Sequence, residues 1–191
     1  MSKNDDKDTM ITYTIITLAD TGVGKTSILN RFSNGKFESK LISTIGFGMS
    51  SKVMTLKNGT KIRLKLIDTA GQENYQALSA TYMKNADCVL FVFSLDKRQS
   101  FEDIKKWMNN LKENNHTLDY NQTFSSYLVG NKSDLEPVIN EDEIEELKNE
   151  NNFYGYIETS TKDDIGINKA FEEIGEIHLK SMVKKNLKIS Y

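Results

Sequence analysis

The feature that most constrains the fold of this chain is a glycine-containing turn between an apolar strand and a helix. The turn from Ala19 to Thr26 reads ADTGVGKT and directly follows the apolar run from Ile11 to Leu18. It matches the phosphate-loop pattern, except that alanine stands in place of the first glycine. Because this loop forms where a strand runs into a helix, the pattern favours an α/β fold.

The residues of this turn suit the binding of phosphate groups. Successive backbone N–H groups can converge on phosphate oxygens, because glycine permits the turn and the helix N-terminus adds a favourable dipole. Lys25 would reach the outer phosphates, and the Thr26 hydroxyl suits Mg²⁺, which prefers hard oxygen ligands. The residues predicted to contact a nucleotide here are Thr21, Gly22, Val23, Gly24, Lys25, Thr26 and Ser27. An ordinary glycine-rich turn is the alternative, which the strand-to-helix setting disfavours.

Two positions of the turn depart from expectation. Ala19 would cost about 1 kcal/mol if its backbone needed a positive φ, and little otherwise. Thr21 carries a branched side chain that would lie beside a terminal phosphate and crowd the attacking water. We therefore expect nucleotide binding to survive and hydrolysis to be slow.

The remaining pattern alternates between strands and helices. The Asn58-Gly59 pair predicts a tight antiparallel hairpin between residues 52–57 and 62–66. Further strands are predicted at residues 87–93, 124–129 and 154–157, with helical patterns between them, which indicates parallel strands with crossover helices. Ser100 and Asn140 are plausible helix caps. A last helix carries a core stripe of Ile167, Ala170, Phe171, Ile174 and Ile177.

Length and composition bound the class of protein. A chain of 191 residues fits one domain, and a formal net charge of -2 gives no general attraction to nucleic acid. Cys88 lies in an apolar run and is the single cysteine, so we expect a buried, inert thiol. No stretch approaches a membrane span and the polar start resembles no signal peptide, so we expect a cytoplasmic protein.

The run VGNKSD, ending at Asp134, indicates which base is bound. An aspartate carboxylate can accept both N1–H and the exocyclic amine of guanine, whereas adenine offers no such pair of donors. A site with a buried carboxylate rejects the base that leaves it unpaired. Asp134 therefore predicts guanine over adenine and disfavours an ATP-using kinase or ATPase.

From residue 11 to about residue 183 the chain resembles the Ras superfamily of small GTPases. The resemblance rests on the two motifs above and on residues 42–46 (ISTIG), 68–72 (DTAGQ) and 158–162 (ETSTK). It implies a P-loop NTPase G domain of α/β class, with a mostly parallel six-stranded sheet, one antiparallel strand and about five flanking helices. We expect a disordered segment at residues 1–10, the G domain at 11–183 and a short tail at 184–191.

The resemblance also implies roles for individual residues. Asn131 and Asp134 would read the base, with the Lys132 stem packing on the nucleotide and Phe37 covering the face of the base. An aromatic at position 37 could equally pack into the core. The loop Ser160, Thr161 and Lys162 would brace the base edge, and Gly71 would lie at the terminal phosphate. Mg²⁺ would be held by Thr26, by Thr44 and, through water, by Asp68. Hydrolysis of GTP to GDP would depend on Gln72, Lys25 and Thr44.

Within that superfamily the chain looks most like Rab proteins, from residues 43–46, 82–86 and 100–107. It departs from the Rab pattern at surfaces that Rab proteins use for partners, including Gly48, Met49 and Ile67. The likeness implies that an exchange factor, a GTPase-activating protein and effectors bind through the two switch regions. It also implies a monomer that is cytoplasmic or peripheral on endomembranes. Since no cysteine follows Cys88, we expect no direct lipid anchor on this chain.

Two functions of different class stay open. The leading one is a slowly GTP-hydrolysing switch in vesicular membrane traffic. The other is a nucleotide-bound interaction module that does not cycle, suggested by Ala19, Thr21 and Leu41. Gln72 and Thr44 favour the switch.

Overall fold

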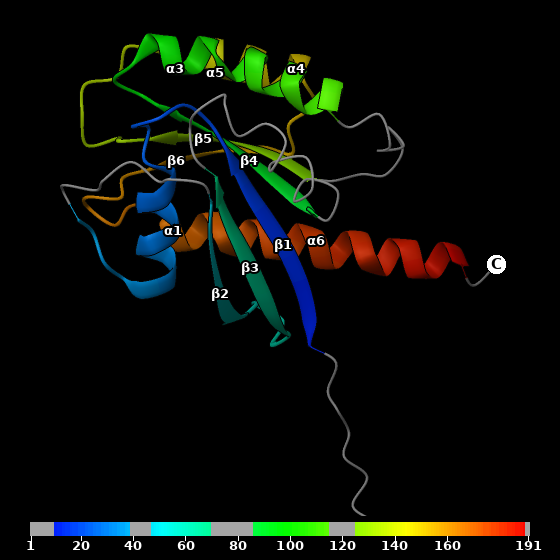
Figure 1. Ribbon diagram of the computed structural model, residues 1–191. Coiled ribbons are helices and arrows are strands. Elements are labelled where there is room, and N and C mark those ends of the chain that lie inside the picture. The colour runs from blue at the N-terminus through cyan, green and yellow to red at the C-terminus, as the bar shows by residue number, and fades with distance from the viewer. Residues whose placement is uncertain (1–9, 39–46, 70–85, 115–124, 190–191) are drawn as a thin grey trace, which may run out of the picture.

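A computed structural model describes residues 10–38, 47–69, 86–114 and 125–189 of the chain. Strands and helices alternate along most of this length (Figure 1). The strands are β1 (Ile11–Leu18), β2 (Phe47–Thr55), β3 (Lys61–Thr69), β4 (Cys88–Ser94), β5 (Ser125–Asn131) and β6 (Gly155–Thr159). The helices are α1 (Lys25–Asn34), α3 (Arg98–Glu102), α4 (Ile104–Asn114), α5 (Glu141–Glu150) and α6 (Ile167–Ile189).

The strands form one six-stranded sheet in the order β2-β3-β1-β4-β5-β6. All neighbours are parallel except β2 and β3, which pair antiparallel from Phe47 opposite Thr69 to Thr55 opposite Lys61. This confirms the predicted α/β fold with a mostly parallel sheet and one antiparallel strand. The parallel strands all end at one edge of the sheet, where the loops that follow them can form a single site.

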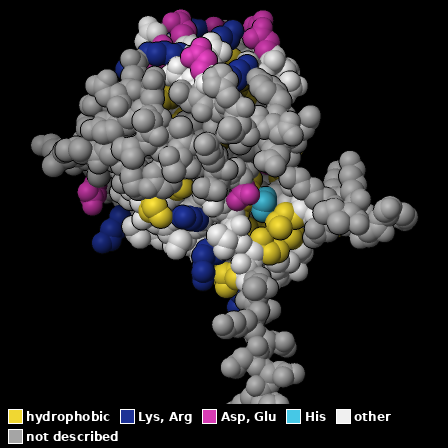
Figure 2. Space-filling model, turned by 45° about the vertical axis from the view of Figure 1, so that its right-hand side comes forward, with side chains coloured by type: hydrophobic (Ala, Val, Ile, Leu, Met, Phe, Trp, Pro, Cys, Tyr) yellow, Lys and Arg dark blue, Asp and Glu magenta, His cyan; other side chains and the backbone are white. Residues whose placement is uncertain are grey.

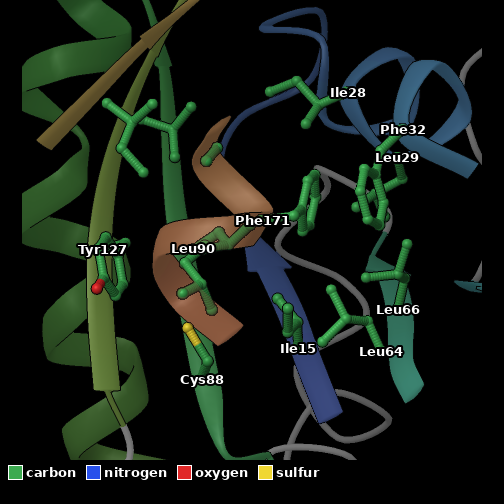
Figure 3. Packing of buried hydrophobic residues seen from close by; sticks show 14 of the residues in the cluster. Ile15, Ile28, Leu29, Phe32, Leu64, Leu66, Cys88, Leu90, Tyr127 and Phe171 are labelled. Carbon is green, nitrogen blue, oxygen red and sulfur yellow. The ribbon is translucent and has the colours of Figure 1, made fainter. Parts of the chain in front are cut away.

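Helices cover both faces of the sheet (Figure 1). One face carries α1 and α6, whose apolar side chains meet alternate residues of β1 and β3 around Phe171 (Figure 3). The Phe171 ring stacks on Phe32 of α1, with ring centroids 3.8 Å apart. The other face carries α3, α4 and α5, packed on a second apolar cluster that includes Phe91 and Phe93. Strands buried on both faces explain why β4 is apolar at nearly every position.

Outside the core, charges of both signs mix on the surface. Figure 2 shows Lys or Arg and Asp or Glu side chains interspersed over the end of the molecule that holds α3, α4 and α5. A single-sign patch of the kind that attracts nucleic acid is therefore not a feature of that region. Cys88 is free and fully buried, as predicted.

Local details differ from the sequence prediction at the hairpin. The ladder ends at Thr55 and Lys61, and the Leu56 N–H donates to the Thr60 carbonyl at 2.9 Å. The turn is thus longer than the tight one predicted from Asn58 and Gly59. The Gly59 N–H also donates to the Leu56 carbonyl at 2.9 Å, and the buried Leu56 side chain lies beside Gly175 of α6.

One of the two predicted helix caps is wrong. Asn140 caps α5 in a capping box with Glu143, as expected. Ser100 caps nothing, because α3 begins at Arg98 and places Ser100 inside the helix. Its hydroxyl donates to the Lys97 carbonyl at 2.7 Å and accepts from the Ser94 N–H at 3.0 Å. The serine is buried there and fastens α3 to β4.

The last helix buries the predicted stripe and runs further than expected. The first four residues of the stripe, from Ile167 to Ile174, are buried, and Ile177 packs partly buried beside them. The helix continues past residue 183, where the tail was predicted to begin, to Ile189, and its end projects beyond the sheet (Figure 1). Over the described residues, none of the helices combines the length and apolarity that crossing a membrane requires.

Candidate functional site

The predicted phosphate loop connects the end of β1 to the start of α1. Gly22 and Gly24 both have a positive φ, of 83° and 100°, a region that favours glycine. Gly24 is the N-cap of α1 and no side chain caps the helix there, so its first turn can serve an anion. Ala19 is buried and is not among the described residues that have a positive φ. Its methyl group therefore causes no backbone strain.

Lys25 folds back over this loop. Its ammonium donates to the Ala19 carbonyl at 2.9 Å and to the Asp20 carbonyl at 2.6 Å, and the residue is only 6% exposed. Burial lowers the pKa of Lys25 to about 8, against the opposing effect of Asp68 and Asp20. The arrangement places a cation inside the turn, where an incoming phosphate would offer it stronger partners than two carbonyls.

The residues predicted to hold Mg²⁺ meet beside Lys25. The Thr26 hydroxyl, in the first turn of α1, donates to Asp68 Oδ2 near the end of β3 at 2.6 Å. Both side chains offer hard oxygen ligands. Among the described residues there is no cluster of three or more His, Cys, Asp or Glu side chains that could hold a metal without other ligands. Such a pair fits Mg²⁺, which is usually held by one or two protein groups together with phosphate and water. The third predicted ligand, Thr44, lies outside the described residues.

The loop is also tied to α4 by a contact that the sequence did not indicate. Trp107 of α4 donates from its indole N–H to Asp20 Oδ1 at 2.9 Å. Burial raises the pKa of this carboxyl above its ordinary value. No spacing rule relates residues 20 and 107, so only the packing of α4 on the sheet brings them together.

Asn131 links the predicted phosphate loop to the segments that are predicted to read the base. This residue ends β5 and is fully buried; its amide donates to the Val23 carbonyl at 2.9 Å and accepts from the Thr159 hydroxyl at 3.1 Å. A side chain on Gly24 would lie 2.2 Å from the Asn131 amide nitrogen. Asn131 was predicted to read the base, and the structure adds a role in joining β5, β6 and the loop. The part played by Thr159 was not predicted.

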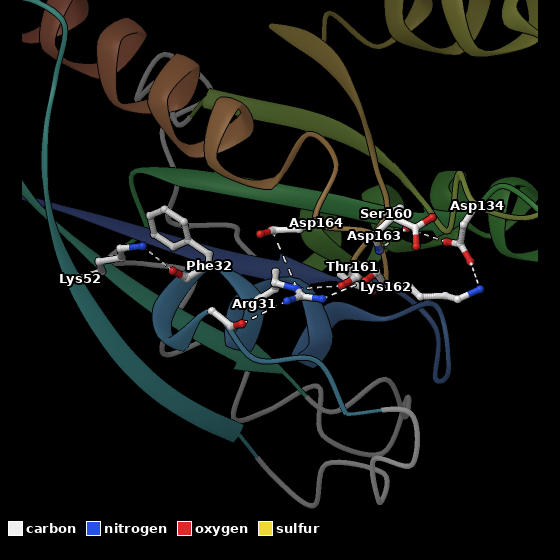
Figure 4. A network of polar contacts seen from close by, with 10 residues as sticks. Arg31, Phe32, Lys52, Asp134, Ser160, Thr161, Lys162, Asp163 and Asp164 are labelled. Atoms are coloured by element: carbon white, nitrogen blue, oxygen red, sulfur yellow. Dashed lines mark hydrogen bonds and ion pairs between the residues drawn. The ribbon is translucent and has the colours of Figure 1, made fainter.

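Asp134 is held in place by the predicted bracing loop. Its Oδ1 accepts from the Ser160 hydroxyl at 2.7 Å, and its Oδ2 lies 3.6 Å from Lys162 Nζ (Figure 4). The side chain is 9% exposed, and the Ser160 hydrogen bond lowers the pKa of the carboxyl, so it stays ionised. An ionised carboxylate held at a fixed position can accept two parallel donors of a ligand.

Four further predicted residues lie in the described part of the chain: Lys132, Thr161, Phe37 and Ser27. Lys132 has a φ of 64° and its ammonium lies 3.6 Å from Asp96 Oδ1. Thr161 is buried, and its carbonyl faces Arg31 rather than Asp134. Phe37 is 37% exposed, which leaves room for the predicted contact with a base, and Ser27 lines a hollow beside residues 36 and 38. Gly71 and Gln72 lie outside the described residues.

The comparisons with known proteins agree with this geometry. A sequence model described as "Ras family" matches residues 14–180. Human Ras-related protein Rab-9B is 38% identical over 162 residues, which cover 83% of this chain and 79% of that protein. Ras-related protein Rab-10 of Diplobatis ommata is 36% identical, over 86% of this chain and 80% of its own length. Rab-11B of Dictyostelium discoideum is 35% identical, over 84% and 70%.

Proposed function

The chain belongs to the Ras family and is Rab-like, and from this premise we propose that it is a GTP-hydrolysing switch in vesicular membrane traffic. The observation that supports it best is the Asn131 amide, which joins the phosphate loop to the strands that carry Asp134 and Ser160. A ligand with a guanine at one end and phosphates at the other would fill both parts of one rigid unit. GTP is such a ligand.

We propose that the base is selected by Asp134. Ser160 and Lys162 already hold its carboxylate, so binding guanine would require little reorganisation. Adenine would not offer this carboxylate the pair of donors that guanine does, so binding adenine would desolvate the charge without pairing it, which is costly. ATP should therefore bind far more weakly than GTP.

The proposed hydrolytic step uses residues on both sides of the phosphates. Lys25 would leave the Ala19 and Asp20 carbonyls to neutralise charge on the outer phosphates. Thr26 and Asp68 would hold Mg²⁺, whose bound form supplies electrostatic stabilisation of phosphoryl transfer. Gln72 would orient the attacking water. Thr44 would link its own segment of the chain to the terminal phosphate.

A slow intrinsic rate forms part of the proposal. Thr21 is exposed on the loop, where its branched side chain would lie near the attacking water. An arginine from an activating protein would compensate for such crowding by stabilising the charge of the transition state. The exchange factor, activating protein and effectors would act through the switch regions, on a monomer in the cytoplasm or on endomembranes.

Single-turnover hydrolysis of GTP with Mg²⁺ tests the proposal, with ATP as the base control. We expect slow turnover of GTP, none of ATP, and a loss of at least about tenfold on Gln72→Leu. Gln99→Leu is the matched control, because Gln99 lies exposed on α3 and its side-chain amide donates to Asp103 at 3.2 Å. Tight GTP binding without turnover would instead support the interaction module that does not cycle.

A further inference from the structure

One partly buried cation beside the site has no role in the function proposed above. Arg31 lies in the last turns of α1, and its side chain is only 15% exposed. It is neither in the phosphate loop nor in the base-reading motifs. Its side chain nevertheless points at the loop that braces Asp134 (Figure 4).

The guanidinium of Arg31 holds two consecutive carbonyls of that loop. Its Nε donates to the Thr161 carbonyl at 2.8 Å, and one terminal nitrogen donates to the Lys162 carbonyl at 2.9 Å. Ser160 directly precedes the first of these carbonyls and Lys162 carries the second, and the side chains of both residues contact Asp134. The position of the base-reading carboxylate therefore depends on where Arg31 holds the loop.

The same side chain also holds the chain beyond α1. Its other terminal nitrogen donates to the Gly35 carbonyl at 3.1 Å, while the Gly35 N–H donates to the Arg31 carbonyl at 2.9 Å. Gly35 has a φ of 67° and ends the helix, so the chain turns there toward Phe37. The guanidinium carbon lies 5.7 Å from the centroid of the Phe37 ring, within cation–π range.

We propose that Arg31 is a positioning residue that holds the base-reading loop and the Gly35–Phe37 turn together, and so controls guanine selectivity and nucleotide release. The planar fork of Arg31 reaches the three carbonyls from three separate nitrogens, whereas the donors of a lysine ammonium all lie on one nitrogen. The ion pair with Asp164 contributes little, since it spans 3.9 Å and Asp164 is half exposed. The inference rests on the proposed function, because it assumes that Asp134 binds guanine.

Dissociation of fluorescent GDP and inosine diphosphate from the full chain tests this inference. Inosine lacks the exocyclic amine, so the ratio of the two rates measures how well Asp134 is placed. Arg31→Lys keeps the charge but loses the fork, and should release GDP about tenfold faster and bring the two rates closer. Arg31→Gln should also speed the release of GDP and bring the two dissociation rates closer. This variant takes the place of Arg31→Lys if Arg31→Lys does not fold.

Arg98→Lys is the matched control. Arg98 also bridges two elements, α3 and α5, through Glu143 and the Val138 carbonyl. The Arg98→Lys variant should have a lower melting temperature but the same ratio of GDP to inosine diphosphate dissociation rates as the natural chain. The inference would be overturned if the Arg31 variants lowered the melting temperature as much as Arg98→Lys does but left both dissociation rates unchanged. That result leaves the proposed function intact as long as the natural chain binds GDP. Failure of the natural chain to bind GDP would overturn the proposed function itself.

Discussion

The phosphate side and the base side of the site are built in different ways. The phosphate side, residues 19–26 with Asp68, comes almost entirely from one turn whose shape depends on two glycines and the start of a helix. The base side, made of Asn131, Asp134, residues 159–162 and Arg31, is assembled from three segments. The pairing of β5 with β6 and the hydrogen bonds of Thr159, Ser160 and Arg31 hold these segments together. A local structure survives changes elsewhere, whereas an assembled one depends on every contact. The predictions below test that difference.

The largest effect should come from the base side. Asp134→Asn replaces one acceptor of the carboxylate with a donor that faces a donor of guanine, so GTP affinity should fall about a thousandfold. Binding of inorganic pyrophosphate, which needs only the phosphate side, should change little. Isothermal titration of both ligands measures the two effects.

Asp163→Asn is the control for that change. Asp163 lies exposed in the same loop, and its backbone N–H rather than its carboxylate contacts Ser160. GTP affinity should stay within about twofold of the natural value, as for most exposed substitutions. Unchanged GTP affinity in Asp134→Asn would remove this account of base selection.

The second effect concerns the point where the two sides meet. Gly22→Ala and Gly24→Ala both place a side chain at positive φ, but only Gly24 has a neighbour, the Asn131 amide at 2.2 Å. Each should lose about 1 to 2 kcal/mol of unfolding free energy from the backbone, and Gly24→Ala about 2 to 3 kcal/mol more. Urea unfolding of the nucleotide-free protein measures the difference, and equal losses would show that the contact between the sides is unimportant.

The smallest expected effect is a pH dependence of the unfolding free energy that comes from the phosphate side alone. Burial lowers the pKa of Lys25 from its ordinary value of 10.5 to about 8. Between these values the Lys25 side chain binds a proton more strongly in the unfolded chain than in the folded one, so its contribution to the unfolding free energy of the nucleotide-free protein should rise with pH. Burial raises the pKa of the Cys88 thiol, which gives an opposing loss over the same range, so the gain from Lys25 is measured against a Lys25→Met reference. Urea unfolding at about pH 7.5 and pH 9.5 should show a gain of about 1 to 2 kcal/mol relative to that reference.

Two variants identify the source of that pH dependence. Lys25→Met should abolish the gain, and Lys112→Met, at an exposed position of α4, should retain it. Asp134 should contribute nothing in this range, because its hydrogen bond with Ser160 lowers the pKa of the carboxyl below its ordinary acidic value. An unchanged slope in Lys25→Met would contradict the buried position assigned to its ammonium.

Much of the fold could be predicted because its signals are local. The strand-to-helix turn, the alternating β3 residues and the stripe of α6 each show their structure within a few residues. The errors arose where a distant contact prevailed. Ser100 looked like a cap, but its hydroxyl links α3 to β4 through hydrogen bonds with Lys97 and Ser94. The hairpin ladder ends at Thr55 and Lys61, and the turn is closed by hydrogen bonds of Leu56 with Gly59 and Thr60.

The sequence by itself determined the family, the phosphate loop and the aspartate that predicts guanine, because each is encoded in a short run of residues. Only the tertiary structure placed Asn131 on the Val23 carbonyl, Trp107 on Asp20 and Arg31 on the loop that braces Asp134. These pairs lie far apart along the chain and follow no spacing rule. Their hydrogen bonds form only after the sheet has brought the ends of its strands to one edge, so no local pattern records them.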